Sequence, residues 1–426
     1  MSLRNTMNTG VSGLITEGRA LGVVGDNVAN LNTVGFKQSR AIFEDVLGGV
    51  GSATGFGVRM ARTQQVFAQG SLLNTDRPTD VALSGDGFFI VRGSVGGVDG
   101  SYYTRAGQCT VRNDGTLVNP GGLAVQGYRA NPDGTFSSQL SSLELPTTTL
   151  PPRATARLTV SANLDSTSVT PTAAFDPNNP GPTSNFSTSM TTYDSLGTPH
   201  TVSVYYRRTG ANSWEYRALA NGAEVVGGTA GRNTEVAAGT LTFNTNGSLQ
   251  NTASTSGGTV SFNGATAAQP LAFNFGTPIA SGGTGLDGIT QFGTPSTVGA
   301  QSQDGYAPGD LSNVRIEADG TVSGIFSNGR TVPVGQIAVA RFRANEGLDR
   351  AGQNLWVATR ESGEPAVGAA GAGGRGSIVA GALEQSNVEV SEQFVDLISH
   401  QRAFQANSKT ITTADQMLQE LMNLGR

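Results

Sequence analysis

Large apolar residues recur every seven positions at both ends of the chain, and this pattern most limits what the chain can fold into. Near the N-terminus they are Met7, Leu14, Leu21 and Val28, with Val11 on the intervening seam. Near the C-terminus they are Val390, Leu397, Phe404, Ile411 and Leu418, with Phe394 on the seam. A seven-residue period places these side chains on one stripe of an α-helix. We therefore predict helices over residues 1–31 and 384–426.

Two interpretations of the stripes stay open. The helices could pack as amphipathic elements on the body of their own chain, or they could associate as in a coiled coil, within or between chains. The C-terminal seam also contains polar residues, Gln401, Ser408 and Asp415. Such residues would weaken an isolated pair of helices but suit a helix that has several neighbours.

Between the two ends the period changes to two. Leu158, Val160 and Leu164 alternate with polar or small residues, which indicates half-buried strands. Turn dipeptides divide the region at Asp114-Gly115, Asp133-Gly134, Asn246-Gly247, Asp319-Gly320 and Asn328-Gly329. We expect hairpin turns with positive φ at both central residues. The predicted fold class is a mainly β, multi-domain body with long α-helices at both termini, coiled-coil-like when assembled.

The chain has 426 residues, which is too long for one ordinary core and favours several domains. Local composition suggests where they divide. We predict an N-terminal helix at 1–31, a Gly-rich connecting region at 32–76, a β domain at 77–149 plus 305–365, an inserted outer β domain at 150–304, a Gly/Ala linker at 366–383 and a C-terminal helix at 384–426. The linker, with a second Gly-rich stretch at 48–57, would act as a flexible joint.

Residues for catalysis are scarce. The chain has one cysteine, Cys109, and two distant histidines, His200 and His400, so no metal-ligand spacing exists. His200 is expected at a surface or strand edge, and His400 at an exposed helical position. We predict no enzyme activity, no cofactor and no metal. The mild net charge of -5 disfavours nucleic acid as a partner. The chain has no apolar run of about 18 residues for membrane insertion, and its start lacks the layout of a cleavable signal peptide.

Several stretches resemble the flagellar axial proteins, a family of rod, hook and hook-associated subunits. The first reads Ala29-Asn30-Leu31-Asn32-Thr33-Val34-Gly35-Phe36-Lys37, and others lie at 80–89, 103–107, 383–388 and 401–409. The signature positions are Ala29, Asn30, Asn32, Thr33, Gly35, Phe36, Asn387, Gln401, Arg402 and Asn407. Cys109 departs from the family, which commonly has an aromatic residue there.

The inserted domain resembles that of the hook subunits, at 193–200 and 239–243. The resemblance implies a subunit that polymerises through its terminal helices into a hollow, bendable tube transmitting torque from rod to filament. It further implies export to an extracellular position and contacts with rod, hook-cap, hook–filament junction and export proteins. The alternatives are a distal rod or hook-associated subunit, or, in another class, a secreted β-rich adhesin with trimerising helices.

Overall fold

The computed structural model describes the chain except for residues 1–2, 48–54, 132–133, 147–148 and 425–426. It contains two compact units. The first comprises Met1–Thr147, Ser312–Ile325 and Thr331–Arg426, and the second Thr148–Leu311 and Phe326–Arg330. The predicted insertion at 150–304 falls within the second unit.

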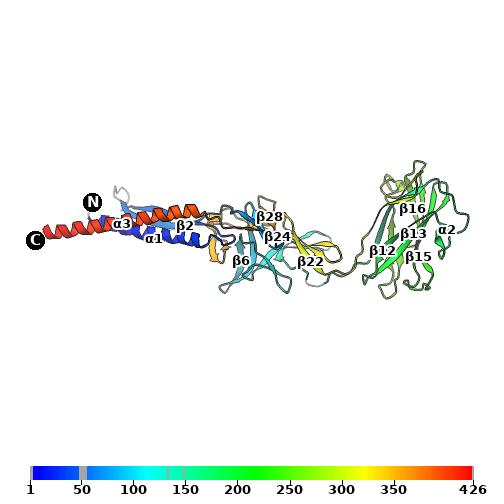
Figure 1. Ribbon diagram of the computed structural model, residues 1–426, viewed down its shortest axis with the longest axis horizontal. Coiled ribbons are helices and arrows are strands. Elements are labelled where there is room, and N and C mark those ends of the chain that lie inside the picture. Colours follow the sequence, from blue (N-terminus) through cyan, green and yellow to red (C-terminus); the bar gives the residue numbers. More distant parts are fainter. Residues whose placement is uncertain (1–2, 48–54, 132–133, 147–148, 425–426) are drawn as a thin grey trace. The chain divides into compact units, whose positions relative to one another are not determined.

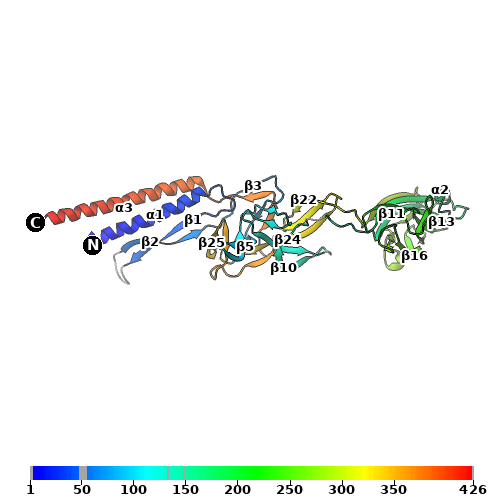
Figure 2. The ribbon, with the colours of Figure 1, turned by 90° about the horizontal axis from the view of Figure 1, so that it is seen from below.

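A long helix lies at each end of the first unit: α1 spans Leu3–Ala29 and α3 spans Val390–Leu424. They run antiparallel and side by side (Figures 1 and 2). The predicted C-terminal helix is wrong at its start, because Ala382–Glu384 forms strand β29, which pairs with β3, Leu72–Asn74. Among the described residues, no helix is both long and apolar enough to cross a membrane.

A hairpin follows α1 in the region expected to be a weakly patterned connection. Its strands are β1, Ser39–Leu47, and β2, Gly55–Gln65. The hairpin lies along α1, where Ser12 Oγ accepts the Val58 N–H at 3.3 Å. The Gly-rich joint expected at 48–57 falls mostly on 48–54, outside the described residues; 55–57 begins β2.

The rest of the first unit, which we call the β body, is built on a twelve-stranded sheet. Its main path runs β22-β23-β24-β9-β5-β6-β26-β25. The strands are β5 Phe88–Val95, β6 Val98–Thr104, β7 Thr110–Val111, β8 Leu117–Val118, β9 Ala124–Ala130, β10 Phe136–Ser142, β22 Leu311–Ile316, β23 Thr321–Phe326, β24 Thr331–Arg341, β25 Asp349–Gly352, β26 Leu355–Val357 and β27 Ala366–Ala369, with a short 3-10 turn at Asn345–Gly347. Edge-to-face aromatic contacts fill its core, including Phe67 with Trp356 at 5.0 Å.

The Gly/Ala stretch 366–383 is not the flexible linker that its composition predicts. Within it, β27 pairs with β24, and β28, Ser377–Ala380, pairs with β4, Val81–Ser84. Ile378 and Ala382 are buried. Glycine and alanine suit close backbone packing as well as flexibility, and composition alone does not separate these two uses.

The second unit packs two sheets around one core. The five-stranded sheet runs β12-β13-β14-β15-β16, and the other contains β19-β11-β20 with β21. Its elements are β11 Arg157–Asp165, α2 Pro180–Thr183, β12 Phe186–Tyr193, β13 Pro199–Gly210, β14 Ser213–Asn221, β15 Asn233–Phe243, β16 Leu249–Gly257, β17 Thr259–Val260, β18 Gln269–Pro270, β19 Ala272–Asn274, a 3-10 turn Ile279–Ser281, β20 Thr290–Phe292 and β21 Thr297–Gln303. The predicted alternation is confirmed: Leu158, Val160 and Leu164 of β11 are all buried in this core.

The turn dipeptides form turns of another type than expected. Positive φ occurs at Gly115, Gly247, Gly320 and Gly329, but not at the Asp or Asn before them. Instead, that side chain accepts an N–H two residues on, as Asp114 Oδ1 does from Thr116 at 2.9 Å. This is a type I turn followed by a left-handed glycine. Asp133 lies outside the described residues.

Cys109 provides a test of how tightly the β body is closed. Its thiol is buried, which raises its pKa to about 12 from an ordinary 9.0. At about pH 8 the thiolate fraction is therefore lower by roughly 10³-fold than in an unfolded chain. We expect iodoacetamide to modify Cys109 only after denaturation, as measured by mass spectrometry. Equal labelling rates with and without guanidinium chloride would contradict the buried position.

Candidate assembly surface

The buried face of α1 consists of small residues, not of the large residues of the predicted stripe. Gly10, Gly13, Thr16, Ala20 and Val24 are buried. They recur every three or four positions and so form one face of the helix. This face packs on α3 and the hairpin.

Two of these glycines allow the helices to approach closely. A Cβ added at Gly10 would lie 2.8 Å from Ile411 Cγ1, and one at Gly13 would lie 2.6 Å from Asn407 Nδ2. Asn407, a signature position, thus packs directly against the backbone of α1. Gly18, on the other side of α1, has nothing within 4 Å of such a Cβ.

Polar bonds fix the register of the helix pair. His400 Nδ1 lies 2.7 Å from Glu17 Oε2, and Phe43 of β1 contacts the imidazole edge-on at 6.1 Å. His400 is therefore half-buried between α3, α1 and the hairpin, not freely exposed as predicted. Near the other end, Asn27 Nδ2 donates to Gln393 Oε1 at 2.8 Å and to the Ser39 carbonyl at 2.7 Å.

The seven-residue stripes remain largely uncovered within the chain. Met7, Leu14, Leu21, Val28, Leu397, Ile411 and Leu418 are half-buried, and Val11, Val390, Phe394 and Phe404 are exposed. Other apolar side chains are exposed beside them, among them Ile15 at 53%, Val395 at 66% and Ile398 at 48%. The α1–α3 pair thus has an internal face of small residues and outer faces with uncovered large apolar residues.

The signature residues at 29–36 and Asn387 lie where the helices meet the β body, whereas Gln401, Arg402 and Asn407 lie along α3. Asn387 Oδ1 accepts the Gln38 N–H at 2.7 Å, and its Nδ2 donates to the carbonyls of Val66 and Ala68. Gly35 has φ of 70°, and a Cβ there would lie 2.5 Å from the Ala106 nitrogen.

Other signature positions have local roles. Asn30 bonds to Asp26 and Thr33, and Phe36 is buried, whereas Ala29, Asn32, Gln401 and Arg402 are exposed.

Three buried charges meet at the same place. Lys37 Nζ donates to Glu384 Oε1 at 2.6 Å, and Arg105 Nη1 lies 3.3 Å from Glu384 Oε2. The Gly70 N–H also donates to Glu384 Oε1, at 3.0 Å. The side chains of Lys37 and Glu384 are fully buried, and that of Arg105 is 3% exposed. We call these three residues the buried ion cluster.

Burial sets the electrostatics of this cluster. Desolvation lowers the pKa of Lys37 below its ordinary value, and the charge of Glu384 opposes that shift. Desolvation also lowers the pKa of Arg105, again against Glu384. Glu384 is the main carboxylate that stabilises both cations, and the charge of Asp86 adds a smaller stabilisation at Arg105.

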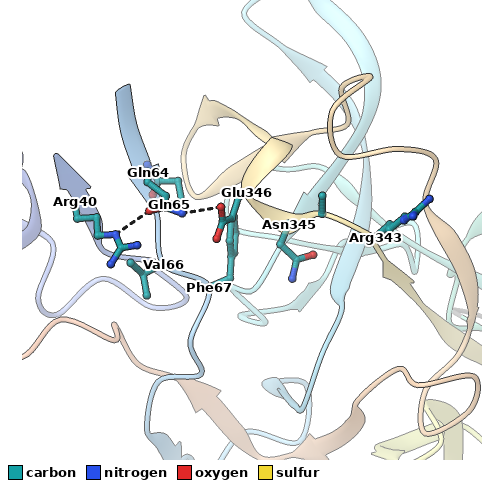
Figure 3. Close-up of a pocket in the computed structure, with 9 residues that line it drawn as sticks. Arg40, Gln64, Gln65, Val66, Phe67, Arg343, Asn345 and Glu346 are labelled. Atoms are coloured by element: carbon teal, nitrogen blue, oxygen red, sulfur yellow. Dashed lines mark hydrogen bonds between the residues drawn. The ribbon is translucent and has the colours of Figure 1, made fainter. Parts of the chain in front are cut away.

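A polar cavity of about 420 Å³ lies between the hairpin base and the loop at 343–346 (Figure 3). Gln64 spans it: its Oε1 accepts from Arg40 Nε at 2.8 Å, and its Nε2 donates to Glu346 Oε2 at 2.6 Å (Figure 3). These bonds join the hairpin to the β body. The cavity lining contains no histidine, cysteine or lysine.

His200, in the second unit, corrects another expectation. It is buried, and it stacks on Phe262 with ring centroids 3.8 Å apart. Its Nδ1 lies 2.7 Å from Glu224 and its Nε2 lies 3.3 Å from Asp194. These contacts join three loops of one fold. In the described residues, no group of three or more His, Cys, Asp or Glu side chains could hold a metal ion.

Sequence reasoning missed both the small-residue face of α1 and the buried ion cluster. The face has a signal, because Gly10, Gly13, Ala20 and Val24 recur at helical spacing. The cluster has none, because Lys37 and Glu384 are 347 positions apart. Both residues lie in the signature stretches, but no role could be assigned to them there.

Models of flagellar families match along most of the chain. They are the flagellar basal body rod protein at 7–37, the flagellar hook protein FlgE/F/G D1 domain at 82–172, the flagellar basal body protein FlaE D2 domain at 163–306 and the flagellar basal body rod FlgEFG protein C-terminal at 379–424. Together with the helix pair and the β body, these matches define a structural protein of the bacterial flagellum and not an enzyme.

Full-length relatives narrow the class. The chain is 37% identical to the flagellar hook protein FlgE of Escherichia coli K12, over 97% of this chain and 98% of that protein. It is 33% identical to FlgE of Treponema pallidum over the full length of both. The chain therefore belongs to the flagellar hook protein family. The crystal structure of Helicobacter pylori FlgE2 shares the fold, with a TM-score of 0.51 over 74% of this chain and 99% of that one, at 16% identity.

The close helix contact can be tested with two glycines of α1. Gly13→Ala should be less stable than Gly18→Ala by ~1–3 kcal/mol, because both changes add the helix preference of alanine but only the methyl group at position 13 displaces Asn407. Gly18→Ala should stabilise the α1–α3 pair by ~0.5–1 kcal/mol, because alanine favours the helix and Gly18 faces open space. Thermal unfolding followed by circular dichroism at 222 nm measures both. Equal shifts in melting temperature for the two variants would refute the close packing.

Proposed function

We propose that the chain polymerises through α1 and α3 into a hollow, bendable helical tube, the hook, which transmits torque from rod to filament. The observation that supports this best is the two-faced helix pair. Its small-residue face is used within the chain, while large apolar side chains such as Phe394 and Ile398 stay exposed. Burying one such side chain contributes roughly 1.5–3 kcal/mol. A head-to-tail contact that does not close produces a filament.

The coiled-coil-like packing predicted from the sequence belongs to this assembly. In it, the exposed stripe residues Val11, Val390, Phe394 and Phe404 contact helices of neighbouring subunits, and the half-buried ones complete the seam. The predicted β domain at 77–149 plus 305–365 and the inserted outer domain at 150–304 form the body of the same subunit.

The remaining partners follow from the place of a hook subunit. Subunits at the base of the hook contact rod proteins. Subunits at its tip contact a hook cap during growth and hook–filament junction proteins afterwards. The chain reaches an extracellular position through the flagellar export apparatus. Full-length similarity to hook proteins favours this role over the rod and hook-associated alternatives.

Electron microscopy of basal bodies from a deletion strain tests the role. We expect a finished rod with no hook, and restoration of hooks by the wild-type gene. Missing rods would indicate a rod subunit, and normal hooks that lack filaments would indicate a hook-associated subunit. Either result would contradict the proposal.

The outer face of α3 gives a sharper test on purified protein. Phe394→Ser with Ile398→Ser removes two exposed side chains, at 50% and 48%, that contribute little within the chain. Loss of their burial between subunits should raise the concentration needed for polymerisation by at least ~100-fold. Sedimentation assays measure this concentration.

Gln405→Ser is the matched control, because it changes an exposed polar residue of the same helix. It should polymerise like the wild type. If the double variant also did so, the outer face of α3 would not be an assembly surface.

A further inference from the structure

We propose that the buried ion cluster is a positioning device: it fixes the direction in which α1 and α3 leave the β body. This inference rests on the proposed function, because a subunit that transmits torque must hold its helices at a fixed angle to its body. Lys37 follows α1, Glu384 precedes α3, and Arg105 follows β6 of the body. The cluster therefore joins the two helix ends to each other and to the sheet.

The covalent connections alone leave this angle free. Each helix is joined to its neighbouring element by single segments, 30–38 after α1 and 385–389 before α3. Single segments rotate easily about their backbone dihedrals. The angle must therefore be set by contacts between segments, and Figure 2 shows the helices leaving the β body side by side.

Glu384 makes such contacts with three separate segments, which contain Gly35 and Lys37, Gly70, and Arg105. Its carboxylate accepts from Lys37, Gly70 and Arg105, and its backbone carbonyl accepts from the Gly35 N–H at 2.8 Å. Lys37 Nζ also donates to the Ala68 carbonyl at 2.7 Å. A rotation of either helix would lengthen several of these bonds at once, at a place that water does not reach.

Directional bonds distinguish this cluster from an apolar contact. Hydrophobic packing has no preferred direction, and buried ion pairs can often be replaced by apolar residues without loss of stability. The charged groups add directional bonds, which specify one orientation of the helices relative to the β body. Arg105 connects Glu384 to the segment after β6 of the body. Its Nε has no hydrogen-bond partner among the described residues.

Arg350 offers a matched comparison with Arg105. Each guanidinium lies 5.4 Å from an aromatic ring, Phe88 for Arg105 and Phe36 for Arg350. Arg105 bonds the carboxylate of Glu384 at 3.3 Å, and Arg350 bonds that of Asp26, on α1, at 3.2 Å. They differ in burial: the Arg105 side chain is 3% exposed and that of Arg350 is 42% exposed.

The test replaces each arginine by methionine in the full-length chain. Arg105→Met leaves the Lys37–Glu384 pair in place and removes the bond between Glu384 and the segment after β6, while the exposed contacts to the body, such as that of Gln64 with Glu346, remain. Spin labels at Val98→Cys on β6 and Gln405→Cys on α3, in a Cys109→Ala background, report the angle as a distance distribution measured by pulsed electron paramagnetic resonance. Both labelled positions are exposed. We expect Arg105→Met to broaden the distribution at least twofold, and Arg350→Met to leave it unchanged.

A second label pair checks the fold. Val98→Cys with Val111→Cys lies wholly in the β body and should stay narrow in every variant. If Arg105→Met broadens the distance distribution of this second pair, the test is repeated with the triple variant Lys37→Met, Arg105→Met, Glu384→Leu, in which the whole cluster is apolar. We again expect a broadened helix-to-body distribution and a narrow one within the body.

Two results would overturn the inference: a broad helix-to-body distribution in the wild type, or a narrow one after removal of Arg105 with the body intact. Neither result depends on whether the chain builds hooks. The proposed function is tested separately, by the deletion strain and by the polymerisation assay.

Discussion

The ion pairs of the Glu384 carboxylate hold together the segments from which the first unit is built. Glu384 sits at the end of β29, just before α3, and it bonds Lys37 and Arg105 where water is excluded. A buried charge without a partner is strongly unfavourable, so all three residues must be in place together. They come from segments near 37, 105 and 384, which means that the cluster forms only when both ends of the chain have returned to the sheet.

The helix pair follows from this closure. Once these segments are held together, the end of α1 lies beside the start of α3, and Gly10 and Gly13 let the two helices stay close along their length. Packing of small residues leaves the larger ones outside. The same helix thereby serves two surfaces, an internal one defined by steric fit and an outer one with uncovered apolar area.

Much of the fold could be predicted from the sequence, because it is encoded locally. The seven-residue stripes indicate α1 and α3, and alternation indicates β11. The predictions that failed concern features that depend on contacts between residues far apart in the sequence. The stretch 366–383 looks like a linker by composition, yet β28 pairs with β4 from the other end of the chain. His200 looked like an edge residue, because nothing near it in sequence reveals Phe262 or Glu224.

The site shows the same division with one difference. The stripe residues that were predicted as a polymerisation surface lie on both helices, whereas the face of small residues that is buried within the chain was not predicted. In a helix that must approach another closely, the smallest residues lie inside. Large apolar residues left outside then have no use within the subunit. Since exposed apolar area is costly in water, their persistence on both helices favours a surface that is covered only when subunits join.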